Sequence, residues 1–188
     1  MHDQRVERVM RYIRAFVVLA LCIAVPVDAR AQVATRLAAP NVVEISERLV
    51  TSGQPSATAL ASLKALGFDA VIYLAPATVS DAVRDESRIV TGQGLVFINL
   101  PVQFEAPSAR DYETFAALLE GLGPRKVLVH CQINLRASSF VFLYRVLALG
   151  DAPRQAYEAL SSVWVPHGPW RRLIETELRD HHIDFELL

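Results

Sequence analysis

Short apolar runs alternate with longer helical segments along most of the chain. Runs rich in Val, Ile and Leu predict β-strands at 42–50, 70–74, 95–100 and 126–129, the first of them interrupted at Glu47. Apolar spacing and capping residues predict helices at 55–66, 80–91, 108–120, 137–149 and 169–181. Strands that alternate with helices predict an α/β fold, a single three-layer domain whose mostly parallel central sheet is flanked by helices.

Capping residues give the expected helix ends. Ser56, Ser80 and Ser108 are N-cap candidates, while Gly67 and Gly92 can end the first two helices. Functional sites in such sheets lie at the carboxyl ends of the strands. We therefore expect site residues in the loops that follow 70–74, 95–100 and 126–129.

The first 31 residues have the pattern of a secretory signal peptide. Four arginines, at positions 5, 8, 11 and 14, precede an apolar stretch at 15–27, and the small residues Ala29 and Ala31 form a cleavage signal. The apolar stretch is short for a membrane span, and an uncleaved anchor is the alternative. We expect residues 1–31 to be a signal peptide, 32–40 a flexible leader and 41–188 the folded domain. The expected location is the periplasm or the exterior.

Charge and cysteine content narrow the class of function. Removal of residues 1–31 takes away five arginines and three acidic residues, which leaves 14 basic and 17 acidic residues and a net charge of −3. This balance favours neither nucleic acid nor an anionic membrane as the main partner, and we expect no stable membrane insertion after cleavage. Cys131 is then the single cysteine, so no internal disulfide can form, and the His, Cys, Asp and Glu residues lack metal-site spacing. We expect no metal and no cofactor.

Residues 126–149 carry the strongest functional signal. The strand at 126–129 leads into His130 and Cys131, and Arg136 directly precedes the helix at 137–149. The first amides of that helix lack partners, and together with the helix dipole they favour an anion, including a thiolate. Arg136 adds a planar fork that can bind two oxygens of a phosphate or sulfate. We predict an anion-binding loop with Cys131 as its nucleophile; the alternative is a buried, inert thiol.

Residues 130–136 resemble the active-site loop of the cysteine-dependent protein tyrosine and dual-specificity phosphatase superfamily, where a His-Cys pair opens a phosphate-binding loop that closes on an arginine. The segments 49–56, 67–74, 99–102 and 164–170 are similar to the bacterial phosphatase-like branch found fused to, or near, β-lactamase-like hydrolases. The resemblance implies the fold of these phosphatases and a phosphocysteine on Cys131. It assigns phosphate binding to five loop residues: Gln132, Ile133, Asn134, Leu135 and Arg136.

The loop departs from the superfamily pattern in two ways. Four residues separate Cys131 from Arg136, with no glycine among them, where these phosphatases usually have five that include a glycine. Any left-handed position in the loop should therefore fall to Asn134, because Asn tolerates positive φ. Ala137 also replaces the Ser or Thr that usually stabilises the departing thiolate. The tighter ring is typical of rhodanese-type sulfurtransferases as well as of this branch.

Two carboxylates are candidates for the general acid that the resemblance implies. The resemblance implies a carboxylate on a separate loop, and the loop at 101–108 carries Glu105, with Asp111 in the following helix. Asp111 is equally well placed to stabilise the helix N-terminus. We interpret His130 as a residue that shapes the turn by hydrogen bonds rather than as an acid or base.

Three functions fit these residues. The first is an exported cysteine-dependent phosphatase that catalyses with Cys131, Arg136 and Glu105. The second is a sulfurtransferase that carries a persulfide on Cys131, and the third is a non-catalytic module that binds anions through Arg136 and the loop amides. The partner is accordingly a phosphorylated or sulfur-donor substrate.

Overall fold

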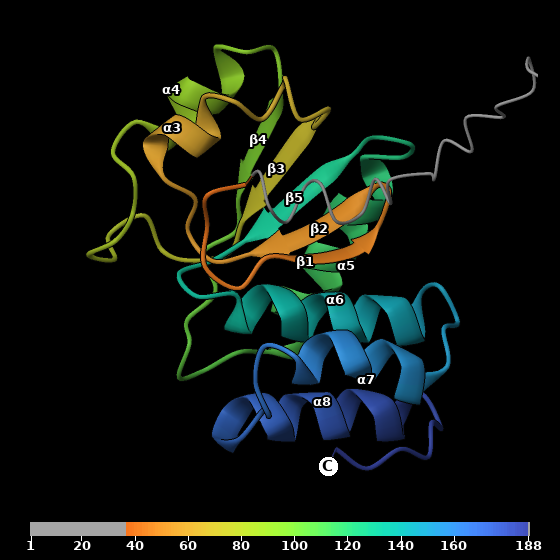
Figure 1. Ribbon diagram of the computed structural model, residues 1–188. Helices are drawn as coiled ribbons and strands as arrows, with labels where there is room; N and C mark the ends of the chain where they lie inside the picture. Colours follow the sequence, from red (N-terminus) through yellow and green to blue (C-terminus); the bar gives the residue numbers. More distant parts are fainter. Residues whose placement is uncertain (1–36, 188) are drawn as a thin grey trace, which may run out of the picture.

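Short, apolar, β-branched segments assemble into the central sheet of the computed structural model, which describes residues 37–187 (Figure 1). The strands in this part of the chain are β1 (Val43–Ser46), β2 (Leu49–Ser52), β3 (Ala70–Tyr73), β4 (Val96–Asn99) and β5 (Val127–His130). Their order is β1-β2-β5-β3-β4, with β1 antiparallel to β2 and the other neighbours parallel. Ser52 and Tyr73 both pair with His130, so β2, β3 and β5 end together.

Alternate residues of each strand supply the two faces of the sheet. Val50, Val71 and Leu128 pack on one face with α3 (Ala57–Leu60) and α4 (Glu86–Thr91). Ile72 and Val129 pack on the other face, which α5 (Ala109–Gly121) and α6 (Leu135–Leu147) cover. This arrangement confirms the predicted three-layer α/β domain with a mostly parallel sheet.

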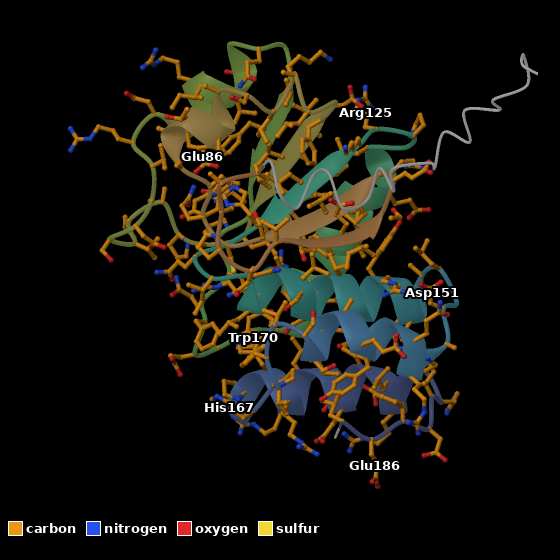
Figure 2. All side chains as sticks on the ribbon, in the orientation of Figure 1. Glu86, Arg125, Asp151, His167, Trp170 and Glu186 are labelled. Carbon is orange, nitrogen blue, oxygen red and sulfur yellow. The ribbon has the colours of Figure 1, made fainter. Side chains whose placement is uncertain are left out.

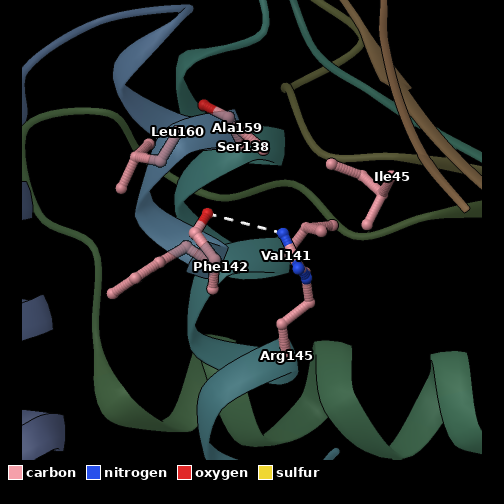
Figure 3. Close-up of a pocket in the computed structure, with 8 residues that line it drawn as sticks. Ile45, Ser138, Val141, Phe142, Arg145, Ala159 and Leu160 are labelled. Carbon is pink, nitrogen blue, oxygen red and sulfur yellow. Dashed lines mark hydrogen bonds between the residues drawn. The ribbon is translucent and has the colours of Figure 1, made fainter. Parts of the chain in front are cut away.

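Two further helices lie outside α6. They are α7 (Pro153–Ser161) and α8 (Gly168–Asp180), which stack beyond α6 in Figure 1. Arg145 of α6 anchors the connection, because its Nε lies 2.7 Å from Asp151 Oδ2 and its Nη1 donates to the Ala156 carbonyl at 3.5 Å. Figure 3 shows the interface between α6, α7 and β1, where the small cavity left by the side chains cannot hold a water molecule.

Capping residues predict some helix ends correctly and others wrongly. Ser108 caps α5 as predicted, and Ser56 caps α3, although α3 ends at Leu60 and the chain continues in turns to Gly67. The predicted start at Ser80 is wrong, because residues 80–85 are not helical and α4 begins only at Glu86. The sequence interpretation also lacked α7.

Residues 37–40 belong to the packed domain rather than to a flexible leader. Leu37 is buried against the sheet face that carries α3 and α4, the Ala38 carbonyl accepts from the Ser56 amide, and the Pro40 carbonyl accepts from the Gly53 amide at 2.7 Å. Residues 37–40, predicted as part of a leader, are therefore packed on the domain. The predicted signal peptide and residues 32–36 lie outside the described residues. None of the helices within 37–187 combines the length and apolar character that a membrane crossing requires.

Candidate active site

The chain between β5 and α6 makes its turn at Asn134. This residue has φ 75°, which confirms the left-handed position predicted for it. Its side chain points away from the loop into the protein, where Nδ2 donates to the Asn41 carbonyl at 2.6 Å and to Thr51 Oγ1 at 3.0 Å. The backbone of Asn134 therefore makes the turn of the loop, and its side chain anchors the loop to Asn41 and Thr51.

The segment after β2 braces the loop from the side. Gly53 forms a β-bridge with Ile133, and the Gln54 amide donates to the Gln132 carbonyl at 2.9 Å. A Cβ on Gly53 would lie 2.8 Å from the Gln132 carbonyl oxygen, so this close approach requires glycine. The Ile133 side chain is 50% exposed and faces solvent.

Cys131 lies directly after β5 at the edge where β2, β3 and β5 end. Its amide donates to the Ser52 carbonyl at 3.2 Å, and its side chain is fully buried and free of any disulfide. Ala137, also fully buried, belongs to the same apolar cluster. Cys131, the nucleophile predicted from the sequence, is thus buried at the start of the loop.

Arg136 closes the loop from the first turn of α6. Arg136 as a whole is 5% exposed, with Nε donating to the Val102 carbonyl at 2.9 Å and Nη1 to Gln132 Oε1 at 3.4 Å. The Phe104 ring lies 5.1 Å from the guanidinium carbon. Arginine has five N–H donors, so three remain for an oxyanion while these two contacts persist.

The loop at 101–108 is held against Arg136 by the aromatic residues near the chain's end. Trp170 is fully buried and donates from Nε1 to the Phe104 carbonyl at 2.8 Å, and its ring packs on Phe104 and Phe140. Trp170 lies near the start of α8 in Figure 2. These contacts favour packing as the role of Trp170, with an indirect effect on the site through Phe104.

A buried pair of ionisable side chains, His130 and Glu86, lies next to Cys131. His130 Nε2 is 2.7 Å from Glu86 Oε1, with side chains 0% and 5% exposed, and Gln54 Nε2 donates to the other oxygen of Glu86 at 2.9 Å. Tyr73 stacks on the His130 ring with centroids 4.7 Å apart. Burial, reinforced by the nearby charge of Glu86, raises the pKa of Tyr73 to about 12, so its hydroxyl keeps its proton at neutral pH.

The sequence interpretation missed this pair. Glu86 begins a short helix that resembles a solvated surface helix in the sequence, and Figure 2 shows it on α4. Only the fold, which brings α4 over the end of β5, reveals that its carboxylate is buried.

The candidate carboxylates occupy three different environments. Glu105 is exposed in a turn of the loop that contacts Arg136, with no polar contact of its own recorded among residues 37–187. Asp111 caps α5 reciprocally with Ser108, so the helix-stabilising interpretation is the one its contacts support. Asp81, which the sequence interpretation did not single out, accepts from Gln132 Nε2 at 2.9 Å. Within the described residues no group of three metal-ligating side chains is assembled.

The structure therefore unites part of the predicted site. Cys131, Gln132 and Arg136 converge on one loop, while Asn134 anchors that loop and Ile133 faces solvent. Leu135 is the first residue of α6 and is half-buried.

Comparison of the structure with solved proteins reveals the same fold elsewhere. A DUF442 protein of Shewanella putrefaciens CN-32, described as a candidate phosphatase, gives a TM-score of 0.68 at 29% identity, over 76% of this chain and 91% of its own. Tk-PTP in its active form gives 0.59 at 23% identity, over 75% and 95%. TpbA of P. aeruginosa, solved with phosphotyrosine, gives 0.54 at 18% identity, over 73% and 90%. At these identities, the similarity to Tk-PTP and TpbA shows a shared fold.

Sequence comparison identifies the family. The curated proteins searched contain no match to this chain. A family profile, described as DSP-PTPase phosphatase fused to NAD+ kinase, matches residues 30–167 and thus most of the chain, including the whole loop from Cys131 to Arg136. This agrees with the superfamily that the residues indicated. The chain belongs to this family of cysteine-dependent dual-specificity and tyrosine phosphatases.

Proposed function

We propose that this protein hydrolyses phosphate monoesters through a phosphocysteine on Cys131. The observation that carries the proposal is the pairing of a buried thiol with a buried guanidinium at the two ends of one loop, at the carboxyl edge of the parallel sheet. The amides at the start of α6 add donors on the same side. A nucleophile among fixed donors is what a phosphoryl group requires.

The proposed reaction has two steps. The Cys131 thiolate attacks phosphorus in line, so that an S–P bond forms while the bond to the ester oxygen breaks and that oxygen takes a proton from a carboxylic acid. Water then attacks phosphorus, the S–P bond breaks, and the same carboxylate receives the proton from the water. Arg136 holds the non-bridging oxygens through the N–H groups that Val102 and Gln132 leave free.

Glu105 remains our predicted proton donor, because it lies on the loop whose Val102 and Phe104 contact Arg136. Asp81 is the second candidate, because its carboxylate is hydrogen-bonded to Gln132 within the loop itself. An aryl phosphate such as phosphotyrosine is the first substrate to test, since phosphotyrosine is the ligand solved with TpbA.

The short ring favours a second candidate function, sulfur transfer. Four residues and no glycine separate Cys131 from Arg136, and Ala137 offers no hydroxyl to a departing thiolate. A sulfurtransferase would take the outer sulfur of thiosulfate as a Cys131 persulfide, release sulfite, and pass the sulfur to cyanide. No alkoxide leaving group needs a proton in that reaction, so Glu105 and Asp81 would be dispensable.

We also propose that the protein is exported after cleavage behind Ala31. The support is the sequence pattern of residues 1–31, which lie outside the described structure. N-terminal sequencing of protein from the cell envelope should begin at Gln32. An intact Met1 in the membrane fraction would contradict cleavage and indicate an anchor.

One side-by-side assay decides between the two chemistries. The protein is supplied with an aryl phosphate in one reaction and with thiosulfate plus cyanide in the other, with Cys131→Ser as the control in both. We expect phosphate release that Cys131→Ser abolishes, because a serine hydroxyl without an adjacent base is a poor nucleophile. Thiocyanate formation without phosphate release would replace the proposal by sulfur transfer, and inactivity in both would leave the anion-binding module.

A further inference from the structure

The proposed reaction makes no use of the triplet formed by the half-buried Gln54 and the buried Glu86 and His130. Glu86 Oε1 lies 2.7 Å from His130 Nε2 without the alignment of a hydrogen bond. Gln54 Nε2 holds the other carboxylate oxygen at 2.9 Å. The opposite ring nitrogen, His130 Nδ1, is buried and has no hydrogen-bond partner among the described residues.

A buried pair of ionisable side chains adds little net stability to a protein core. Removing two charges from water costs more than their attraction returns unless the geometry is very good, and apolar residues of similar volume often serve better. Stability alone therefore does not explain the triplet. Its position suggests a role in the site, because His130 directly precedes Cys131 in the chain and the backbone amide of Gln54 donates to the Gln132 carbonyl.

Charge balance around the site gives the triplet a specific role. Cys131, Arg136, His130 and Glu86 are all at most 5% exposed, so water screens any charge on them only weakly. The Glu86 carboxylate faces the His130 ring at 2.7 Å, and a positive charge held on that ring would favour a thiolate on the next residue. The other groups that act on this region are Tyr73, neutral at physiological pH, and Asp81, which is exposed beyond Gln132.

We propose that Glu86, held by Gln54, is a positioning residue that holds the His130 imidazole in place beside the start of the loop, and thereby favours the thiolate of Cys131. The proposal rests on the proposed function for its catalytic consequence. Its effect on the thiol itself requires no substrate.

The test compares Glu86→Gln with Glu86→Asp and with Asp85→Asn, a matched removal of the neighbouring carboxylate, which is exposed and contacts Arg88. Alkylation by iodoacetamide is measured against pH by mass spectrometry of the peptide that carries Cys131. We expect Glu86→Gln to slow alkylation at about pH 6 by about ten-fold, which corresponds to a displacement of about one pH unit. Glu86→Asp should restore part of the rate, and Asp85→Asn should match the parent protein.

Steady-state kinetics on an aryl phosphate supply the second readout. Glu86→Gln should lower kcat and displace the acidic limb of its pH profile upward while KM stays within about two-fold, because Arg136 and the loop amides still bind the phosphate. A parent protein without phosphatase activity whose alkylation still depends on Glu86 would refute the proposed function and support this inference.

Folding controls keep the inference falsifiable. If Glu86→Gln is folded and alkylates like the parent, Glu86 does not act on Cys131 and the inference is overturned. If Glu86→Gln does not fold, Gln54→Met, which removes the donor and keeps the volume, replaces it in the same assays. A folded Gln54→Met with the parent's profile, or the failure of both variants to fold, would assign the triplet to structure alone.

Discussion

Gly53→Ala should disable the site while leaving the fold in place. The new Cβ would lie 2.8 Å from the Gln132 carbonyl oxygen, 2.9 Å from Pro40 Cβ and 3.0 Å from Ile133 Cα. Carbon atoms at rest are about 3.5–4.0 Å from their neighbours, so the loop must move away by about 0.5–1 Å. Two of the three contacts are backbone atoms of the loop, which cannot rotate aside as a flexible side chain would.

A displacement of this size has separate effects on stability and rate. Overpacking costs about 1–3 kcal/mol, partly offset by about 0.4–1 kcal/mol from the restricted unfolded chain, so we expect the free energy of unfolding to fall by about 1–2 kcal/mol. A misplacement of about 1 Å in a catalytic constellation costs about 100-fold in rate, and we expect a loss of kcat of that order.

Urea denaturation and turnover of an aryl phosphate measure the two effects. Gly121→Ala is the matched control, because a Cβ there meets no atom within 4 Å at the end of α5. This variant should gain about 0.5–1 kcal/mol and keep its activity. A Gly53→Ala protein whose kcat stays within about two-fold of the parent would refute the idea that the contact between Gly53 and the loop positions the catalytic groups.

Four other results are expected. Asn134→Ala should lower the free energy of unfolding, measured in urea, by about 2–3 kcal/mol, because a buried side chain loses two hydrogen bonds at a left-handed position. A cost below about 1 kcal/mol would contradict this anchoring role. Calorimetry should show weaker binding of vanadate, phosphate and sulfate to Arg136→Lys, since an ammonium cannot form two parallel hydrogen bonds; unchanged affinity would exclude Arg136 as the clamp. Glu105→Gln should slow hydrolysis of an alkyl phosphate far more than that of an aryl phosphate, whereas the same selectivity in Asp81→Asn would transfer the acid role to that residue. Denaturation at increasing pH should show the free energy of unfolding falling between about pH 10 and 12, because the folded state keeps a proton on Tyr73 that the unfolded chain releases. The shift in the pKa of Tyr73 accounts for at most about 2–3 kcal/mol of this fall. Tyr73→Phe should make the fall smaller.

Local patterns were sufficient for the sheet and for the turn of the loop. The β-branched runs that end at Tyr73 and His130 form strands because they are buried on both faces, and Asn134 is the loop residue best able to adopt positive φ. The cap at Ser108 was equally predictable, since it depends on Asp111 three residues later.

Contacts between distant segments explain what the sequence interpretation lacked. Ser80 carries a local cap signal, but the loop that contains it extends over the site, where Asp81 meets Gln132, and the helix starts later. The hydrogen bond from Gln54 to Glu86 joins residues 32 positions apart, and no local pattern predicts it. Leu37 likewise is buried only because the α3 and α4 face of the sheet offers an apolar surface.

Trapping the covalent intermediate tests the central claim most directly. The protein is mixed with an aryl phosphate, quenched in acid during turnover and digested, and the peptide that contains Cys131 is examined by mass spectrometry. The account predicts a phosphoryl group on Cys131 that appears during turnover, decays when the substrate is exhausted, and is absent from Cys131→Ser. Phosphate release without any modification of Cys131 would contradict it.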